Sequence, residues 1–450
     1  MATIALMGLL SDAAGNLAAA RAQMALSLGW HIVIACLGVG FPLMIVIVEV
    51  MARRTGSDEL MRLAKRWAQA AALLFAIGAV SGTILSFEMG LLWPGLMATF
   101  GPVFGFPFAL EGIAFFLEAI FIGVYLYGWD RLGPRAHLAS GLPVIISGVA
   151  SAFFVVTANS WMNEPAGFDL VSGKLVHPDP IAAMFNAATP IETTHMIRAA
   201  FMVAGFLVAS VYAVGWLRGR RDQYHRIGFL VPFIVAALAT PPQIVVGDLA
   251  ARFVAEHQPA KLAAMEGLYT TTNGVAEHLG GIYYGDSLHY DIEIPRALSI
   301  LISGHPDSRV VGLEAYPPDQ RPAVNVVHPA FDVMVGSGFL LLFASAWLGL
   351  LAWRRRRLPE SRWFWRLAVI SGPLAAVAME CGWIVTEVGR QPWIVYGIMR
   401  TADAVNPAPG LPIGLFVLVF VYTGLTVSAV VMLRRLGRRN EGESFAGARP

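Results

Sequence analysis

The chain has 450 residues, of which 56% are hydrophobic and only 14% are charged, with a formal net charge of +2. This composition excludes an ordinary soluble domain and indicates an integral membrane protein. The basic residues are spread over several segments and form no patch, so nucleic acid is not an expected partner.

Apolar runs long enough to cross a bilayer occur nine times along the chain. A helix is the expected form of each run, because it satisfies its own backbone hydrogen bonds inside lipid. The expected fold class is therefore an all-α integral membrane protein, with a single membrane domain over 1–450. The predicted spans are 24–51, 68–93, 106–128, 138–158, 191–217, 227–247, 329–353, 364–386 and 412–434.

Lysine and arginine predict how the spans are oriented. Five alternate segments, 52–67, 129–137, 218–226, 354–366 and 434–450, hold 22 of the chain's 32 lysines and arginines. By the positive-inside rule these segments face the cytoplasm. The N-terminus is then expected outside and the C-terminus in the cytoplasm. The first 23 residues lack the features of a cleaved secretory signal, so the first span is expected to remain as an anchor.

Two outer connections are longer than the others. Residues 159–190 have the composition of a loop, with several glycine, proline and asparagine residues. Residues 248–328 are polar and are expected to form a loop with one or two short amphipathic helices. A loop of this length in a compact protein is usually functional or disordered. We therefore expect 248–328 to carry a binding function at the outer face.

Five side chains with ligand chemistry lie in the outer parts of predicted spans: His31, Glu111, His195, Met334 and Glu387. Ionisable groups in lipid are costly unless they line a cavity, find a partner or bind a cofactor. Alternating helix directions are expected to bring all five to one depth. Imidazole, thioether and carboxylate can all ligate haem iron, so the pattern favours a cluster of redox cofactors.

Each of these residues also has a structural interpretation. A single membrane histidine is commonly a hydrogen-bonded group, and a single methionine usually only packs. Glu387 beside Arg390 can be an ion pair at a helix end. The residues alone therefore indicate a membrane redox or proton-handling protein, with a proton-coupled secondary transporter as the alternative.

Glu111 and Glu118 are seven residues apart, which places them on one face of a helix, about 10 Å apart along its axis. Carboxylates spaced in this way suit a proton relay in a medium of low dielectric constant. The alternative is that they form hydrogen bonds to neighbouring helices.

Several segments together resemble subunit I of the cytochrome bd-type quinol oxidases. Each motif is short, but their order and their fit to nine spans extend the resemblance over nearly the whole chain. The segments are 108–118, 128–133, 158–162, 334–338 and 382–393, the last ending in Gly389-Arg390-Gln391-Pro392-Trp393.

The resemblance implies three haems and their ligands. His195 and Met334 would be the axial pair of a low-spin haem b. Glu387 would ligate a high-spin haem b, with Trp383 and Arg390 beside it.

The third haem, either haem d or a further b-type haem, would be ligated by His31 at the site where oxygen is reduced. Glu111 would lie on its other side and Glu118 further along the proton path. Asp332, two residues before Met334, stands where the better-known family members are expected to have arginine, and this departure leaves the identity of the third haem open.

The resemblance also implies a substrate, partners and a location. Gln258, Lys261 and Glu266 match the quinol-binding part of the outer loop. The expected function is quinol oxidation at the outer face and reduction of O2 to water with protons from inside, which builds a gradient without pumping. A second membrane subunit (subunit II), and with it a small accessory subunit, would complete the oxidase in the bacterial cytoplasmic (inner) membrane.

Overall fold

The computed structural model describes residues 13–355 and 357–446. The expected outer N-terminus falls on residues 1–12, which lie outside the described residues. Within the described ranges, nine helices are long and apolar enough to cross a membrane, as the sequence predicted. They are α2 (Ala13–Thr55), α3 (Asp58–Leu92), α4 (Pro94–Tyr127), α5 (Pro134–Asn163), α7 (Thr189–Leu217), α8 (Gln223–His257), α11 (Val324–Arg355), α12 (Arg362–Gly389) and α14 (Leu411–Ala446).

Most of these helices extend well beyond their apolar runs. Proline occupies the first turn of α4 and of α5, where the N–H that it lacks would have no partner within the helix. The helix α4 therefore begins at Pro94, twelve residues before the predicted start at 106. The helix α8 also extends further than predicted. It continues to His257, so residues 248–257, the start of the predicted loop, are helix. The expected boundary at 248 was wrong because backbone hydrogen bonds continue a helix through polar turns after the hydrophobic signal ends.

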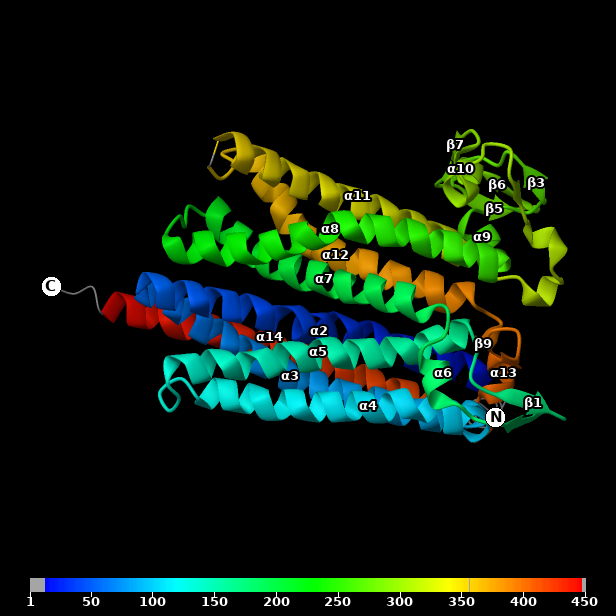
Figure 1. Cartoon of the computed structure of the whole chain (residues 1–450), viewed down its shortest axis with the longest axis horizontal. Helices are drawn as coiled ribbons and strands as arrows, with labels where there is room; N and C mark the ends of the chain where they lie inside the picture. Colours follow the sequence, from blue (N-terminus) through cyan, green and yellow to red (C-terminus); the bar gives the residue numbers. More distant parts are fainter. Residues whose placement is uncertain (1–12, 356, 447–450) are drawn as a thin grey trace, which may run out of the picture.

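The spanning helices form two groups of four that lie side by side along the long axis of the molecule (Figure 1). The first group contains α2, α3, α4 and α5, and the second contains α7, α8, α11 and α12. The helix α14 packs on α2 and α3, while α2 and α7 join the groups. A buried apolar cluster supplied by α2, α7, α8, α11 and α12 lies at this junction and includes Cys36, Phe206, Phe233, Leu341 and Met379.

Short elements cover one end of the bundle (Figure 1). The segment 159–190, expected as loop, contains the end of α5, an antiparallel hairpin of β1 (Asp169–Val171) and β2 (Lys174–Val176), and α6 (Pro180–Met184). A second antiparallel pair, β9 (Trp393–Val395) with β10 (Met399–Arg400), and the short α13 (Thr401–Ala404) follow α12.

The long connection between α8 and α11 is more structured than expected. Its helices are α9 (Pro259–Met265) and α10 (Ala297–Ser303), with 3-10 turns at η1 (Leu313–Ala315) and η2 (Pro318–Gln320). Between them, three antiparallel pairs form: β3 (Thr272–Asn273) with β8 (Arg309–Val310), β4 (Glu277–Leu279) with β7 (Ile292–Ile294), and β5 (Ile282–Tyr284) with β6 (Ser287–His289). The two helices match the expectation. The strands were missed because two or three residues are too few to show an alternating pattern.

A polar cluster is buried among apolar residues near the opposite end of the first helix group. Glu49 is 0% exposed. Its carboxylate accepts hydrogen bonds from Arg53 Nε at 2.7 Å and from Tyr125 Oη at 2.5 Å, and it lies 2.8 Å from His137 Nδ1. Partners from α2, α4 and α5 thus hold the Glu49 carboxylate inside the protein.

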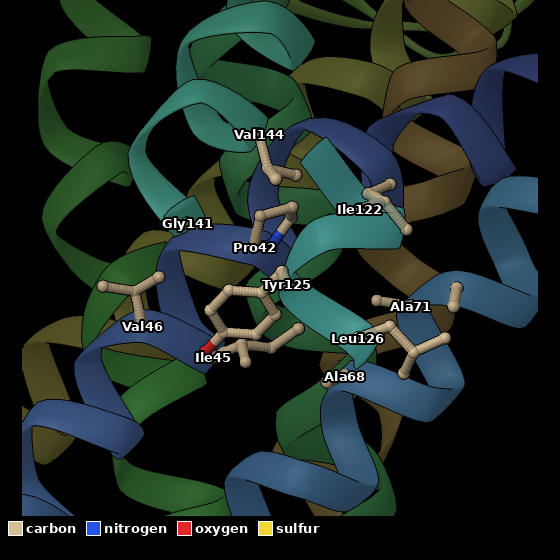
Figure 2. Close-up of a pocket in the computed structure, with 11 residues that line it drawn as sticks. Pro42, Ile45, Val46, Ala68, Ala71, Ile122, Tyr125, Leu126, Gly141 and Val144 are labelled. Atoms are coloured by element: carbon tan, nitrogen blue, oxygen red, sulfur yellow. The ribbon is translucent and has the colours of Figure 1, made fainter. Parts of the chain in front are cut away.

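Beside this cluster, a small apolar pocket of about 30 Å³ opens between α2, α3, α4 and α5 (Figure 2). Its lining includes Pro42, Ile45, Tyr125 and Val144, and Figure 2 shows the Tyr125 ring among aliphatic side chains. The pocket contains none of the residues expected at the reaction site.

Candidate functional site

His195 and Met334 lie in the second helix group, each beside a glycine of a neighbouring helix. The Nδ1 atom of His195 is buried and has no hydrogen-bond partner. A Cβ atom placed on Gly247 of α8 would lie 3.6 Å from the His195 ring, and one on Gly382 of α12 would lie 3.1 Å from Met334 Sδ. An unpartnered imidazole nitrogen is costly unless a ligand occupies it. These residues therefore fit an iron-ligating pair, although the described contacts do not join the two side chains directly.

Glu387 connects the two helix groups near the C-terminal end of α12. Asn159 Nδ2 of α5 donates a 2.5 Å hydrogen bond to Glu387 Oε1, and Arg390 Nη2 donates one of 2.7 Å to Oε2. The Glu387 side chain is 31% exposed, whereas the Arg390 side chain is 1% exposed and its Nε has no partner. Trp383, one helical turn before Glu387, packs on the buried cluster between the groups. The ion pair predicted as the alternative for Glu387 is thus present.

Asn163, the last residue of α5, links the residues around Glu387 to the long connection between α8 and α11. Its Oδ1 accepts hydrogen bonds from Lys261 Nζ at 3.1 Å and from Arg390 Nη1 at 3.4 Å. Its Nδ2 donates to Glu192 Oε1 at 2.9 Å and to Asn159 Oδ1 at 3.2 Å. Two asparagines one turn apart thus link a loop lysine to the proposed haem ligand through side chains alone.

The three residues expected to bind quinol are all buried, with exposures of 2% for Gln258, 4% for Lys261 and 2% for Glu266. Gln258 Nε2 donates to the Asn163 carbonyl at 2.8 Å, on the same side as Lys261. The pKa of Lys261 is lowered to about 7, chiefly by burial and then by the charge of Arg390, while Glu192 and Glu387 act in the opposite direction.

Glu266 belongs to a different set of contacts. Burial raises the pKa of the Glu266 carboxyl well above its usual value, and the neighbouring Glu277 and Asp332 raise it further. Its Oε2 has no hydrogen-bond partner. Asp332 itself accepts a 2.6 Å hydrogen bond from the Gly280 N–H of the loop. Lys261 and Glu266 therefore face different neighbours, although they are five residues apart in the sequence.

His31, Glu111 and Glu118 lie in the first helix group. His31 Nδ1 lies 2.8 Å from Ser81 Oγ of α3, and a Cβ atom on Gly82 would lie 3.1 Å from its ring. Ser151 of α5 donates a 3.1 Å hydrogen bond to Glu111. Glu118 is 5% exposed.

Glu118 faces the point where α2 and α5 meet. Cβ atoms placed on Gly38 and Gly148 would lie 3.8 and 3.6 Å from its Oε1. Among the described contacts, none joins Glu111 or Glu118 to His31. The two carboxylates nevertheless both turn towards α5, as their spacing predicted.

Glu111 and Glu387 contact α5 at different heights, whereas the sequence predicted one depth for them. Glu387 contacts Asn159 of α5, whereas Glu111 contacts Ser151, eight residues earlier in the same helix. At 1.5 Å per residue, these contacts lie roughly 12 Å apart along α5. The error came from taking 106 as the start of a helix that begins at Pro94.

Four further polar residues in this region have no role predicted from the sequence: Asn159, Asn163, Glu192 and Glu380. Neutral amides carry little hydropathy signal, and Asn163 appeared to lie in a loop. Glu380 Oε1 is buried without a partner, and its Oε2 would lie 3.2 Å from a Cβ atom on Gly29. The one feature of the sequence that pointed to Glu380 was its position two helical turns before Glu387.

A pocket of about 140 Å³ opens beyond the C-terminal end of α12. It lies between the start of α9, the 3-10 turn η2 and the residues that follow α12, and its lining includes Ala260, Gln320, Arg390 and Tyr396. A polar ligand or water can therefore approach Arg390 from the loop side.

Comparison with known proteins gives one consistent result. The family model described as cytochrome bd terminal oxidase subunit I matches residues 19–441. A Bacillus subtilis protein named putative cytochrome bd menaquinol oxidase subunit I is 35% identical, over 93% of this chain and 96% of the relative. A second B. subtilis protein, cytochrome bd ubiquinol oxidase subunit 1, is 32% identical over 87% of this chain and 86% of its own length.

Among solved structures, the bd oxidase from Geobacillus thermodenitrificans superposes with a TM-score of 0.88 and 39% sequence identity. The match covers 94% of this chain and 99% of that chain. The similarity therefore extends over the whole bundle and is not confined to a single motif.

Proposed function

Because the chain belongs to the cytochrome bd terminal oxidase subunit I family, we propose that it oxidises quinol at its outer face and reduces O2 to water. Two quinols and one O2 give two quinones and two waters, so four electrons and four protons balance. The relatives named above are quinol oxidases, and they lend no support to the transporter alternative. The single structural observation behind the proposal is the Asn163 junction, which links a loop lysine to Glu387.

We assign the haem ligands by combining family membership with side-chain geometry. His195 and Met334 would hold a low-spin haem b, Glu387 a high-spin haem b, and His31 a third haem of type d or b. When bound, haem supplies one-electron transfer and a site for O2. The unpartnered His195 Nδ1 and the glycines that face His195, Met334 and His31 support this assignment.

At the quinol end, Lys261 and Gln258 would orient the head group. The Lys261 ammonium can donate a hydrogen bond to a quinol oxygen, and Gln258 Oε1 is a buried acceptor without a partner. Glu266, whose pKa is raised by burial and by the charges of Glu277 and Asp332, would accept a proton from quinol. Arg390 and Trp383 would keep Glu387 in position beside the haem.

On the oxygen side, Glu118 and Glu111 would carry protons towards the third haem. Both turn towards α5 on one face of α4, and the nearly complete burial of Glu118 suits a group that passes protons without access to bulk water. Protons released at the outer face and taken up from the other side would build a gradient without a pump.

The proposed assembly includes a second membrane subunit and, beyond it, a small accessory subunit in a bacterial inner membrane. The proposed orientation places the loop between α8 and α11 outside and the basic helix ends in the cytoplasm. The loop and the N-terminal end of α2 lie at the same end of the bundle, as the six spanning helices between them require (Figure 1).

The test begins with the absorbance spectrum of the purified oxidase and with quinol-dependent O2 consumption. Haem bands with quinol oxidase activity are expected, whereas a colourless protein without this activity would refute the proposal. Lys261→Met should abolish most quinol turnover while the haem bands stay intact. Normal quinol turnover in that variant would remove Lys261 from the substrate site.

A further inference from the structure

Glu192 has no part in the reaction described above, yet it lies one side chain from Lys261. The two are joined by Asn163, whose Nδ2 donates to Glu192 at 2.9 Å while its Oδ1 accepts from Lys261 at 3.1 Å. An ammonium group only donates and a carboxylate only accepts, so these partners determine the orientation of the amide. Asn163 is 1% exposed, which keeps water from replacing either bond.

The charged groups that face Lys261 come from two helices. Arg390 and Glu387 belong to the end of α12, and Glu192 to the first turn of α7. Arg390 already binds Glu387 at 2.7 Å. Glu192 is therefore the one carboxylate among these groups that has no cation bound directly to it, and it balances the charge of Lys261 through the amide.

The position of Lys261 depends on a close approach of its stem to α12. A Cβ atom placed on Gly389 would lie 2.8 Å from Lys261 Cγ, so only glycine leaves room for the buried side chain. The ammonium then lies in a low-dielectric site where burial lowers the Lys261 pKa to about 7. A group that titrates in this range is sensitive to the loss of any nearby negative charge.

We propose that Glu192 is a positioning residue for quinol oxidation: through Asn163 it keeps Lys261 charged and aimed at the quinol head group. The inference rests on the quinol-binding role proposed above for Lys261. Only the protonated amine can donate all its hydrogen bonds and attract the electron-rich quinol oxygen. Quinol oxidation should therefore have an alkaline limit set by Lys261, and Glu192 determines where that limit lies.

The experiment measures the rate at which quinol reduces the haems of the complete oxidase without O2, from acid to alkaline pH. Glu192→Gln keeps the size of the side chain and can still accept from Asn163, but it removes the charge. The alkaline limit of this variant should move about one pH unit lower, which is the shift expected from losing one nearby opposite charge. Above that limit, the rate of haem reduction should fall up to about tenfold below the wild-type rate. Haem bands and O2 consumption with an artificial one-electron donor should not change.

Three further variants make the result specific. Glu192→Asp keeps the charge and should restore most of the wild-type pH profile. Glu256→Gln removes an exposed carboxylate near the end of α8 and should leave the profile unchanged. Asn163→Asp places a carboxylate directly against Lys261, and in the Glu192→Gln background it should move the limit back to higher pH.

Several outcomes would overturn the inference. A wild-type alkaline limit in Glu192→Gln would do so, as would the same shift in Glu256→Gln or an equal loss in Glu192→Asp. If Glu192→Gln does not assemble with haem, Glu192→Ser decides in its place, because it removes the same charge: its limit should fall, and an unmoved limit refutes the proposal. Lys261→Met separates the failure of this inference from the failure of the proposed function. Normal quinol turnover in Lys261→Met refutes the binding role of Lys261. A wild-type pH profile in Glu192→Gln, together with an inactive Lys261→Met, refutes only the role of Glu192.

Discussion

Asn159 donates a 2.5 Å hydrogen bond from Nδ2 to Oε1 of Glu387, and the two residues belong to different groups of four helices. The bond places a neutral amide between the proposed haem ligand and Asn163, which holds the loop lysine. Beside Arg390, the orientation of Glu387 thus depends on a helix that supplies no expected iron ligand. This relationship makes the end of α5 a structural link between the proposed quinol-binding lysine and the proposed haem ligand.

Replacing Asn159 with leucine should disturb the Glu387 site more than the fold. The variant loses a hydrogen bond to a charged group, which costs about 1.5–3 kcal/mol. We expect altered absorbance of the high-spin haem b and weaker retention of that haem, with the low-spin bands preserved. Absorbance spectra and haem quantification of the purified variant measure both effects. Unchanged high-spin bands would contradict a role of Asn159 in holding Glu387.

Met334→Leu should remove the low-spin haem b signal. Leucine keeps nearly the same volume and apolarity, so packing should change by less than about 1.5 kcal/mol, but it offers no sulfur to iron. Reduced-minus-oxidised spectra measure the result. The matched control is Met202→Leu, which changes a buried methionine of α7 that lies in the apolar cluster. An intact low-spin spectrum in Met334→Leu would show that this methionine only packs.

Glu118→Gln should slow O2 reduction while leaving quinol binding and low-spin haem reduction nearly intact. The amide keeps the shape of the side chain but cannot carry a proton, and Glu118 lies between glycines of α2 and α5 that leave room for it. We expect a loss of about 10²-fold or more in O2 consumption, within the range attributed to a positioned proton-transfer group. Rapid mixing of the reduced variant with O2, with proton uptake followed by a dye, provides the measurement. Wild-type uptake would reduce Glu118 to a hydrogen-bonding group of the helix interface.

Glu277→Gln should shift the acid limb of quinol oxidation to lower pH. Burial first, then the charges of Glu277 and Asp332, raises the pKa of Glu266, so Glu266 becomes able to accept a proton only as the pH rises through that raised value. Removing the Glu277 charge lowers the pKa of Glu266, and the limb should move down by about half a unit to one unit. Initial rates measured over a pH series give the shift. Glu293→Gln, an exposed position on the paired strand, serves as control, and an equal shift there would point to a general surface-charge effect.

Glu49→Leu should destabilise the protein without a specific effect on either half-reaction. The substitution leaves Arg53, Tyr125 and His137 without their shared acceptor in a buried site, and breaking such a pair costs about 3–5 kcal/mol. We expect a lower thermal-unfolding midpoint but normal haem bands in the folded fraction. A stable variant with slowed proton uptake would instead assign Glu49 to the proton path.

The nine spans and the membrane class were determined by the sequence alone. Each span must be apolar along its own length, because lipid offers no hydrogen bonds, so the signal is local and survives without knowledge of the neighbours. The same locality explains why ligand-type residues such as His195 and Glu387 stood out, since an ionisable group in an apolar run is visible without any contact being known. Family resemblance added the roles that these residue types alone left open.

Tertiary structure decided how the candidate residues are grouped. Helix ends such as Pro94 and His257 lie in polar segments, where backbone hydrogen bonds and packing, rather than hydropathy, set the limit. Lys261 and Glu266 are five residues apart in sequence, yet they turn to different neighbours, because one packs against α12 and the other against the loop strands and α11. Asn163 and Glu192 acquire their importance only when α5, α7 and α9 meet, since a hydrogen bond between distant segments leaves no pattern along the chain.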